Sequence, residues 1–164
     1  MADAAPQLTD LIAIAAAAAA DARSHAYAPY SNFTMGAAVV SAEGAVVDGV
    51  LVENVSLGLA MCAERVALFA AVTRSVRPVV LAVCSKRTGG ELTLPCGACL
   101  QVALELAGED LTVVAVDPDG EIEHAPLRSL LPRAPRRRSP EYDASPRIRS
   151  ADQSAIAAYT SERS

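Results

Sequence analysis

Apolar residues along the chain follow two patterns, helical spacing in some segments and almost unbroken runs in others. The stretch from Leu8 to about Ala26 is rich in Ala, the best helix former, and predicts a helix capped by Thr9 or Asp10. Further helices are predicted over residues 62–74, 98–106 and 127–131. Strands are predicted over residues 34–41, 45–51, 79–86 and 111–117, the last of them continuing through 122–124 after a turn.

The almost continuous Val/Leu/Ala run over 79–86 is typical of a strand buried on both faces of a sheet. Such strands, interleaved with helices, predict an α/β fold, a three-layer α/β/α sandwich with a mixed sheet. We expect residues 1–132 to form the folded domain and 133–164 a basic extension rich in Pro, Arg and Ser. Within that extension, 150–158 is a candidate for a short helix.

Composition and charge narrow the function classes. The chain has 164 residues, of which 52% are hydrophobic, and this size predicts one domain with a substantial core. Its net charge is −5, divided between a balance of +3 on residues 133–164 and −8 on the rest. An acidic body argues against binding a phosphate backbone, so no nucleic-acid partner is expected.

No segment is long and apolar enough to predict a membrane span or a membrane partner. The Ala run at 13–20 lies between Asp10 and Asp21 and lacks the basic start of an export signal. We therefore expect a cytoplasmic location, with the four cysteines as reduced thiols or metal ligands.

Three cysteines stand at the starts of predicted helices, Cys62 at one and Cys96 and Cys99 at the next. A helix N-terminus favours a thiolate, and three converging thiolates suit Zn²⁺ with a fourth position open for water. Cys84, inside a buried strand, is expected to be a small apolar residue rather than a ligand. A purely structural zinc site and a site without metal remain alternatives.

Glu64 lies two residues after Cys62, within reach of a water on the metal without being a ligand. A carboxylate there can take a proton from that water and pass it to a leaving amine. The neighbouring Arg65 can hydrogen-bond the sulfurs and offset the negative charge of three thiolates on Zn²⁺. The alternatives are a first-turn acid that favours the helix dipole and an exposed helix arginine.

These residues resemble the small zinc-dependent cytidine deaminases, a family that also includes blasticidin S deaminase relatives. The resemblance covers about residues 8–132. Its central feature is the zinc-deaminase signature, in which a Glu beside the zinc ligands is not itself a ligand. It is carried by Cys62-Ala63-Glu64, by Pro95-Cys96-Gly97-Ala98-Cys99, and by four further stretches, namely 28–33, 36–38, 53–54 and 130–132.

The resemblance implies a homotetrameric zinc hydrolase that converts cytidine or deoxycytidine to uridine or deoxyuridine with release of ammonia, as in pyrimidine salvage. It implies zinc binding by Cys62, Cys96 and Cys99 and a proton shuttle at Glu64. On the substrate side, it implies contacts from the Ala63 backbone to the base, packing of Phe33 on the base, and a ribose hydroxyl held by Glu53.

Several positions depart from the family pattern on the sugar side of the expected pocket. Leu51 stands where the family has an Asn that helps hold the sugar hydroxyl, and Leu57 and Pro135 replace frequent aromatics. The alternative substrate is therefore a different amino-heterocycle or a modified nucleoside, in the manner of blasticidin S. In a further alternative, Tyr142 or Tyr159 of the extension covers the pocket.

Two other function classes stay open at this point. The run of three arginines at 136–138 allows a deaminase that edits nucleic acid, although the acidic body lacks aromatic stacking platforms. A non-catalytic protein that uses zinc only for folding is the other alternative.

Overall fold

The computed structural model describes residues 6–135. The chain order is α1 (Leu8–Arg23), β1 (Met35–Val40), β2 (Val46–Val50), the short 3-10 helix η1 (Leu57–Leu59), α2 (Ala63–Thr73), β3 (Val80–Ser85), α3 (Gly97–Ala107), β4 (Thr112–Val116), β5 (Ile122–Pro126) and α4 (Leu127–Leu130). Within this part of the chain, no helix is both long and apolar enough to cross a bilayer.

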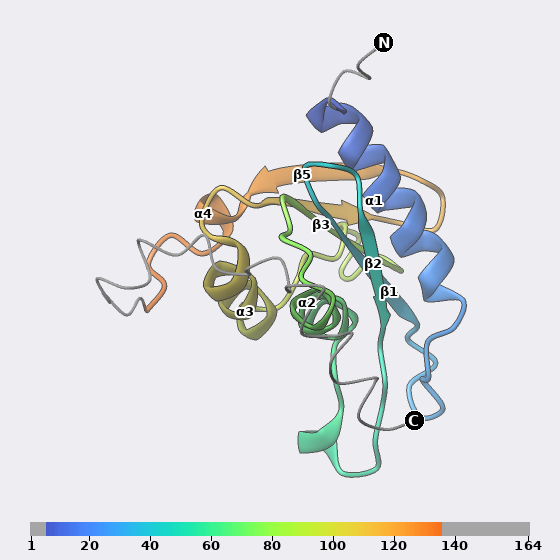
Figure 1. The fold of residues 1–164 in the computed structure, drawn as a ribbon. Helices are drawn as coiled ribbons and strands as arrows, with labels where there is room; N and C mark the ends of the chain where they lie inside the picture. The colour runs from blue at the N-terminus through green and yellow to red at the C-terminus, as the bar shows by residue number, and fades with distance from the viewer. Residues whose placement is uncertain (1–5, 136–164) are drawn as a thin grey trace, which may run out of the picture. The chain divides into compact units, whose positions relative to one another are not determined.

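The five strands form one mixed sheet in the order β2-β1-β3-β4-β5 (Figure 1). The β3–β4 pair is parallel, because α3 carries the chain back between these strands, and the other pairs are antiparallel. The mixed sheet and the alternation of helices with buried strands confirm the predicted fold class.

The helices cover both faces of the sheet, and the sheet divides the core into two clusters. On one face, small residues of α1 such as Ala15 and Ala19 pack against Ala38, Ala82 and Val114. On the other face, α2, α3 and α4 pack against the strand residues whose side chains point to that face, including Val39 and Leu81. Each cluster lies between the sheet and one helix layer of the three-layer sandwich (Figure 1).

Two glycines allow the helices to approach the sheet closely. A Cβ added at Gly36 of β1 would strike the backbone of α1 at Ala19 and Arg23. A Cβ added at Gly49 of β2 would strike the backbone of α2 at Ala63 and Ala67. Each glycine therefore fixes the distance between one helix and the sheet.

Two details differ from the sequence-based expectations. The cap of α1 is Gln7 rather than Thr9 or Asp10, and the carboxylate of Asp10 accepts the Gln7 backbone N–H at 3.0 Å. Residues 122–126 form a separate antiparallel strand, β5, instead of continuing β4. The reversal occurs because Asp117 Oδ1 accepts the N–H groups of Asp119 and Glu121 and holds the turn.

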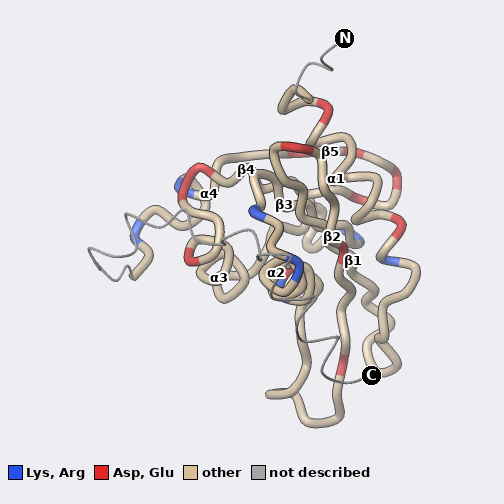
Figure 2. The backbone as a smooth tube through the Cα atoms, viewed as in Figure 1, with Lys and Arg blue, Asp and Glu red and all other residues tan. Residues whose placement is uncertain are grey.

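The predicted division of the chain at residues 132/133 remains a prediction. The basic segment 136–164, including its candidate helix and the two tyrosines, lies outside the described residues. Along the described chain, acidic positions outnumber basic ones, in line with the acidic balance expected for the body (Figure 2).

Candidate active site

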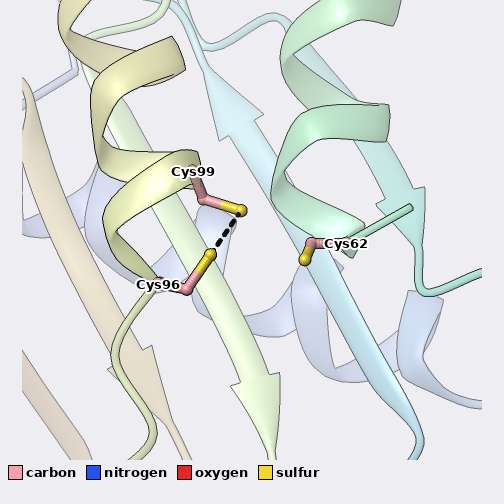
Figure 3. Close-up of side chains that lie close together, drawn as sticks. All are labelled: Cys62, Cys96 and Cys99. Atoms are coloured by element: carbon pink, nitrogen blue, oxygen red, sulfur yellow. Dashed lines mark hydrogen bonds between the residues drawn. The ribbon is translucent and has the colours of Figure 1, made fainter. Parts of the chain in front are cut away.

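The three cysteines at helix starts lie together in the structure. Cys62 is the N-cap residue of α2, Cys96 is the N-cap residue of α3, and Cys99 lies in the first turn of α3. Their Sγ atoms all lie within 4.8 Å of one another, and those of Cys96 and Cys99 are hydrogen-bonded at 3.5 Å (Figure 3). Cys84 lies apart from them in β3, buried, as expected.

This donor set fits a tetrahedral zinc ion. A Zn–S distance of about 2.3 Å places sulfurs about 3.8 Å apart at the corners of a tetrahedron, within the observed spread. The described residues add no fourth His, Cys, Asp or Glu to the cluster. A metal held by these three thiolates keeps one position free for a small ligand, which is typical of catalytic rather than structural zinc.

Hydrogen bonds prepare the sulfurs for metal binding. Hydrogen bonding from Cys99, with a further contribution from the Arg65 guanidinium, lowers the pKa of the Cys62 thiol to about 5. Arg65 Nη2 donates to Cys62 Sγ at 3.5 Å. The pKa of Cys99 is raised by its hydrogen bond to Cys62 and by burial. The helix N-terminus and the arginine therefore both favour a thiolate at Cys62.

Glu64 lies in the first turn of α2, with 1% of its surface exposed. Its Oε2 atom is buried and, among the described residues, has no hydrogen-bond partner. Burial raises the pKa of this carboxyl group, which makes it a candidate to hold and release a proton. A buried acceptor without a partner is costly, so this arrangement points to a donor supplied by a ligand.

A pocket of about 520 Å³ opens beside the chain that leads into Cys62. Its lining includes Leu51 and Glu53, two of the expected substrate-binding residues, but not Phe33 or Ala63. Phe33 is half-buried and Ala63 is fully buried at the start of α2. The pocket is lined by Tyr30, Ser31, Leu51, Glu53, Asn54, Val55, Leu57 and Ala60.

The carboxylate of Glu53 is held by the chain segment just before β1. Its Oε2 accepts the backbone N–H groups of Tyr30 at 2.8 Å and Ser31 at 3.3 Å, and its Oε1 accepts the Ser31 hydroxyl at 2.5 Å. The Ser31 hydroxyl contact, followed by the Tyr30 N–H, lowers the pKa of Glu53, which is therefore ionised at neutral pH. Sequence reasoning did not assign these contacts, although Tyr30 and Ser31 belong to a stretch that it singled out.

Two other pocket residues, Asn54 and Leu57, have an internal hydrogen bond or high solvent exposure instead of a contact that points to a ligand. Asn54 Oδ1 accepts the Ser56 N–H at 2.8 Å, which uses this carbonyl inside its own turn. Leu57 is 87% exposed at the tip of the chain segment between β2 and α2. Both Tyr142 and Tyr159, the candidate covers, lie outside the described residues.

Comparisons with known proteins agree with this site. The family model described as "Cytidine and deoxycytidylate deaminase zinc-binding region" matches residues 11–115. The chain is 42% identical over 116 residues to the cytidine deaminase of Halalkalibacterium halodurans, a match that covers 71% of this chain and 87% of that protein. It is 37% identical over 115 residues to the probable cytidine deaminase of Dictyostelium discoideum, covering 70% and 77% respectively.

Solved structures show the same relationship. The cytidine deaminase of Burkholderia pseudomallei superposes with a TM-score of 0.67 at 43% identity, covering 79% of this chain and 99% of that chain. The cytidine deaminase of Mycobacterium tuberculosis superposes with a TM-score of 0.62 at 37% identity, covering 74% and 94%.

The family match explains the donor set: the cofactor is Zn²⁺, and the three-cysteine cluster is able to hold it. The family match also gives the buried glutamate beside the cluster a place in a hydrolytic deaminase. The chain belongs to the zinc-dependent cytidine and deoxycytidylate deaminase family.

Proposed function

We propose that this protein hydrolyses cytidine or deoxycytidine to the uracil nucleoside and ammonia, with Cys62, Cys96 and Cys99 as zinc ligands and Glu64 as the proton shuttle. The observation that carries the proposal is the buried, unpartnered Oε2 of Glu64 one turn from a three-thiolate cluster. The relatives named cytidine deaminase supply the substrate class.

The roles of the residues follow from their positions. When bound, Zn²⁺ acts as a Lewis acid that lowers the pKa of water toward neutrality. Glu64 accepts one proton from the attacking water and delivers it to the ring nitrogen beside the attacked carbon. It then transfers the second proton of that water to the amine, as the carbon–amine bond breaks and the carbonyl forms. Burial raises the pKa of its carboxyl, so the protonated form is accessible during this cycle.

Arg65 supports the cluster rather than the substrate. Its guanidinium donates to Cys62 Sγ and offsets the net negative charge of three thiolates on a divalent ion. On the substrate side, we assign base contacts to the Ala63 backbone and the Phe33 ring. Leu51 and Glu53 lie at the pocket wall and contact the sugar end.

A second candidate is the same deamination of another amino-heterocycle or a modified nucleoside such as blasticidin S. It is favoured by the leucines that line the pocket, Leu51 and Leu57, where the family pattern is polar or aromatic. The two candidates share the zinc chemistry and differ in the substrate that the pocket accepts.

Ammonia release by the zinc-loaded full-length chain tests both candidates, with cytidine, deoxycytidine, cytosine and blasticidin S as substrates. The matched control is Glu64→Gln, which keeps the shape of the side chain and loses its titratable proton. We expect turnover of cytidine and a loss of about 10²–10⁴-fold in kcat for the variant at unchanged zinc content. No turnover of any of the four amines would contradict the proposal.

We further propose a homotetramer that acts in pyrimidine salvage in the cytoplasm. The homotetramer is supported by exposed apolar side chains between β2 and α2, with Val55 81%, Leu57 87% and Leu59 69% exposed. Exposed apolar clusters of this kind are typical of protein interfaces. Light scattering coupled to gel filtration measures the mass; a monomer at micromolar concentration would contradict this part.

A further inference from the structure

A guanidinium just beyond β3 has no part in the proposed reaction and bridges two segments of the chain. Arg87 Nε donates to Asp117 Oδ2 at 2.9 Å, and Nη2 forms an ion pair with the carboxylate of Glu121. The third nitrogen, Nη1, donates to the carbonyl oxygen of Gly90 at 3.1 Å. Arg87 therefore fastens the chain that follows β3 to the turn between β4 and β5.

The turn between β4 and β5 is a firm support for this guanidinium. Asp117 is 4% exposed, and its Oδ1 accepts the backbone N–H groups of Asp119 at 3.0 Å and Glu121 at 2.9 Å. Hydrogen bonds between a guanidinium and a carboxylate are stronger than those between neutral groups. Because β3 and β4 are parallel, the chain leaves both strands at the same edge of the sheet, which brings Arg87 and Asp117 together.

The chain held in this way leads directly to the second zinc ligand. The β3–α3 loop, residues 86–95, connects β3 to Cys96, the N-cap residue of α3 (Figure 3). Near its middle, the two glycines of residues 89–90 have φ values of 63° and 90°, in the left-handed region, and reverse the chain. Thr93 Oγ1 donates to the carbonyl oxygen of Lys86 at 2.8 Å and closes the loop just before the ligand.

Cys96 is the ligand that depends most on the chain before it. Cys99 is buried within α3 and Cys62 is partly buried, whereas Cys96 is exposed. Cys96 also has an extended backbone, with φ −67° and ψ 162°, so it lies outside the helical turns that hold Cys99. The preceding residue, Pro95, has a fixed φ and links the loop stiffly to Cys96. A displacement of the β3–α3 loop is therefore passed to the Cys96 sulfur.

We propose that Arg87 is a positioning residue of the metal site: by holding the β3–α3 loop against the β4–β5 turn, it fixes the place of the Cys96 sulfur among the three thiolates. Zinc–sulfur distances vary by only about 0.2 Å, so a small displacement of this sulfur weakens metal binding. The inference rests on the ligands named in the proposed function and adds a residue outside both the cysteine cluster and the pocket lining.

Zinc affinity, measured by competition with a chromophoric chelator, tests this role without substrate. Arg87→Gln removes the charge and the branched donor group. We expect its zinc affinity to fall by about tenfold, the lower end of the range for residues that orient metal ligands. Arg128→Gln is the matched control, because it removes another arginine–carboxylate pair, with Asp110, and should keep the wild-type affinity. Wild-type affinity in folded Arg87→Gln overturns the proposal.

Melting temperatures with and without zinc separate positioning from general stability. A residue that only stabilises the fold lowers both temperatures equally, and zinc then raises the melting temperature as much as in the wild type. We expect the rise given by zinc to be smaller in Arg87→Gln than in the wild type, and an equal rise overturns the proposal. If Arg87→Gln does not fold, Arg87→Lys, which keeps the charge but not the branched group, is measured in the same way with the same expected direction.

Co²⁺ in place of zinc reports the geometry of the sulfur ligands through its absorption spectrum. Cys96→Ser, with two thiolates left of three, should lose about a third of the thiolate-to-metal absorption. We expect the absorption of Arg87→Gln to lie between that of Cys96→Ser and that of the wild type, and Arg128→Gln to match the wild type. A wild-type spectrum for Arg87→Gln overturns the proposal.

The same measurements separate this inference from the proposed function. A weakened metal site in Arg87→Gln supports the inference even where the wild type releases no ammonia from any of the four amines, in which case only the proposed function fails. An unchanged metal site in this variant, together with turnover of cytidine by the wild type, overturns the inference alone. A Co²⁺ spectrum that does not change in Cys96→Ser overturns the ligand assignment and the inference with it.

Discussion

The close contact between Gly49 and α2 allows one substitution to be followed from the sheet to the zinc site. A methyl group at this position would lie 2.7 Å from the carbonyl oxygen of Ala63 and closer still to the backbone nitrogen of Ala67, whereas ordinary contact begins at 3.4 Å. Gly49→Ala must therefore push α2 away from the sheet by about 1 Å, since close-packed interiors do not absorb such overlaps.

The displaced end of α2 carries the N-cap residue Cys62 and the buried Glu64. Zinc–ligand distances tolerate changes of about 0.2 Å, and a misplacement of about 1 Å at a reacting group costs about 100-fold in rate. We expect Gly49→Ala to lower both zinc affinity and kcat/KM by about 100-fold, in addition to about 1–3 kcal/mol of overpacking cost. Competition with a chromophoric chelator measures the affinity, and thermal unfolding measures the stability.

A matched variant on the neighbouring strand separates the two effects. Gly36→Ala strikes α1 at Ala19 and Arg23 in the same way, but α1 carries none of the expected metal ligands. This variant should lose stability while it keeps the zinc affinity of the wild type. Gly58→Ala, where nothing lies within 4 Å of the added Cβ, should change neither property. Wild-type zinc affinity in folded Gly49→Ala would refute the reasoning.

Three further outcomes are expected. Arg65→Gln removes the donor to Cys62 Sγ and should weaken zinc binding by about 10–100-fold, as measured by chelator competition. Arg74→Gln, at the other end of α2, is the control and should leave zinc affinity unchanged. Removal of zinc should lower the melting temperature by roughly 10 °C, because metal binding free energy is folding free energy; an unchanged scanning-calorimetry midpoint would contradict this. The Glu121 N–H and Arg87 lower the pKa of Asp117, so the ionised carboxylate stabilises the fold above the ordinary pKa of 3.8, and this effect is lost as the pH falls through the folded-state pKa. Asp117→Asn should therefore have a lower melting temperature than the wild type at pH 7 and the same melting temperature at pH 2.

Short-range patterns in the sequence predicted most of the fold and the chemical half of the site. Helix starts at Cys62 and Cys96 depend on local backbone preferences, and the apolar run that contains β3 depends on burial on both faces. Both properties can be inferred from neighbours in the chain. The three cysteines converge because α2 and α3 lie on the same face of the sheet (Figure 1).

The features that were missed depend on contacts between distant residues. The anchoring of Glu53 joins positions 22 and 23 residues apart, and no periodicity indicates which acceptor a backbone N–H will use. The separate strand β5 depends on an aspartate that holds a turn through its own side chain. The capping residue Gln7 was missed because the pattern favours Thr or Asp at that place, and here Asp10 acts from inside the helix.

The outer strand β5 carries features that resist the addition of another strand to the sheet. β5 is exposed along its first three residues, carries Glu123 and ends at Pro126, which has no N–H to donate. Charges and proline on an edge strand discourage intermolecular β-pairing and hence aggregation. The unpaired backbone of an outer strand can act as a template for another chain. The β5 edge therefore protects the protein from edge-to-edge polymerisation at high concentration.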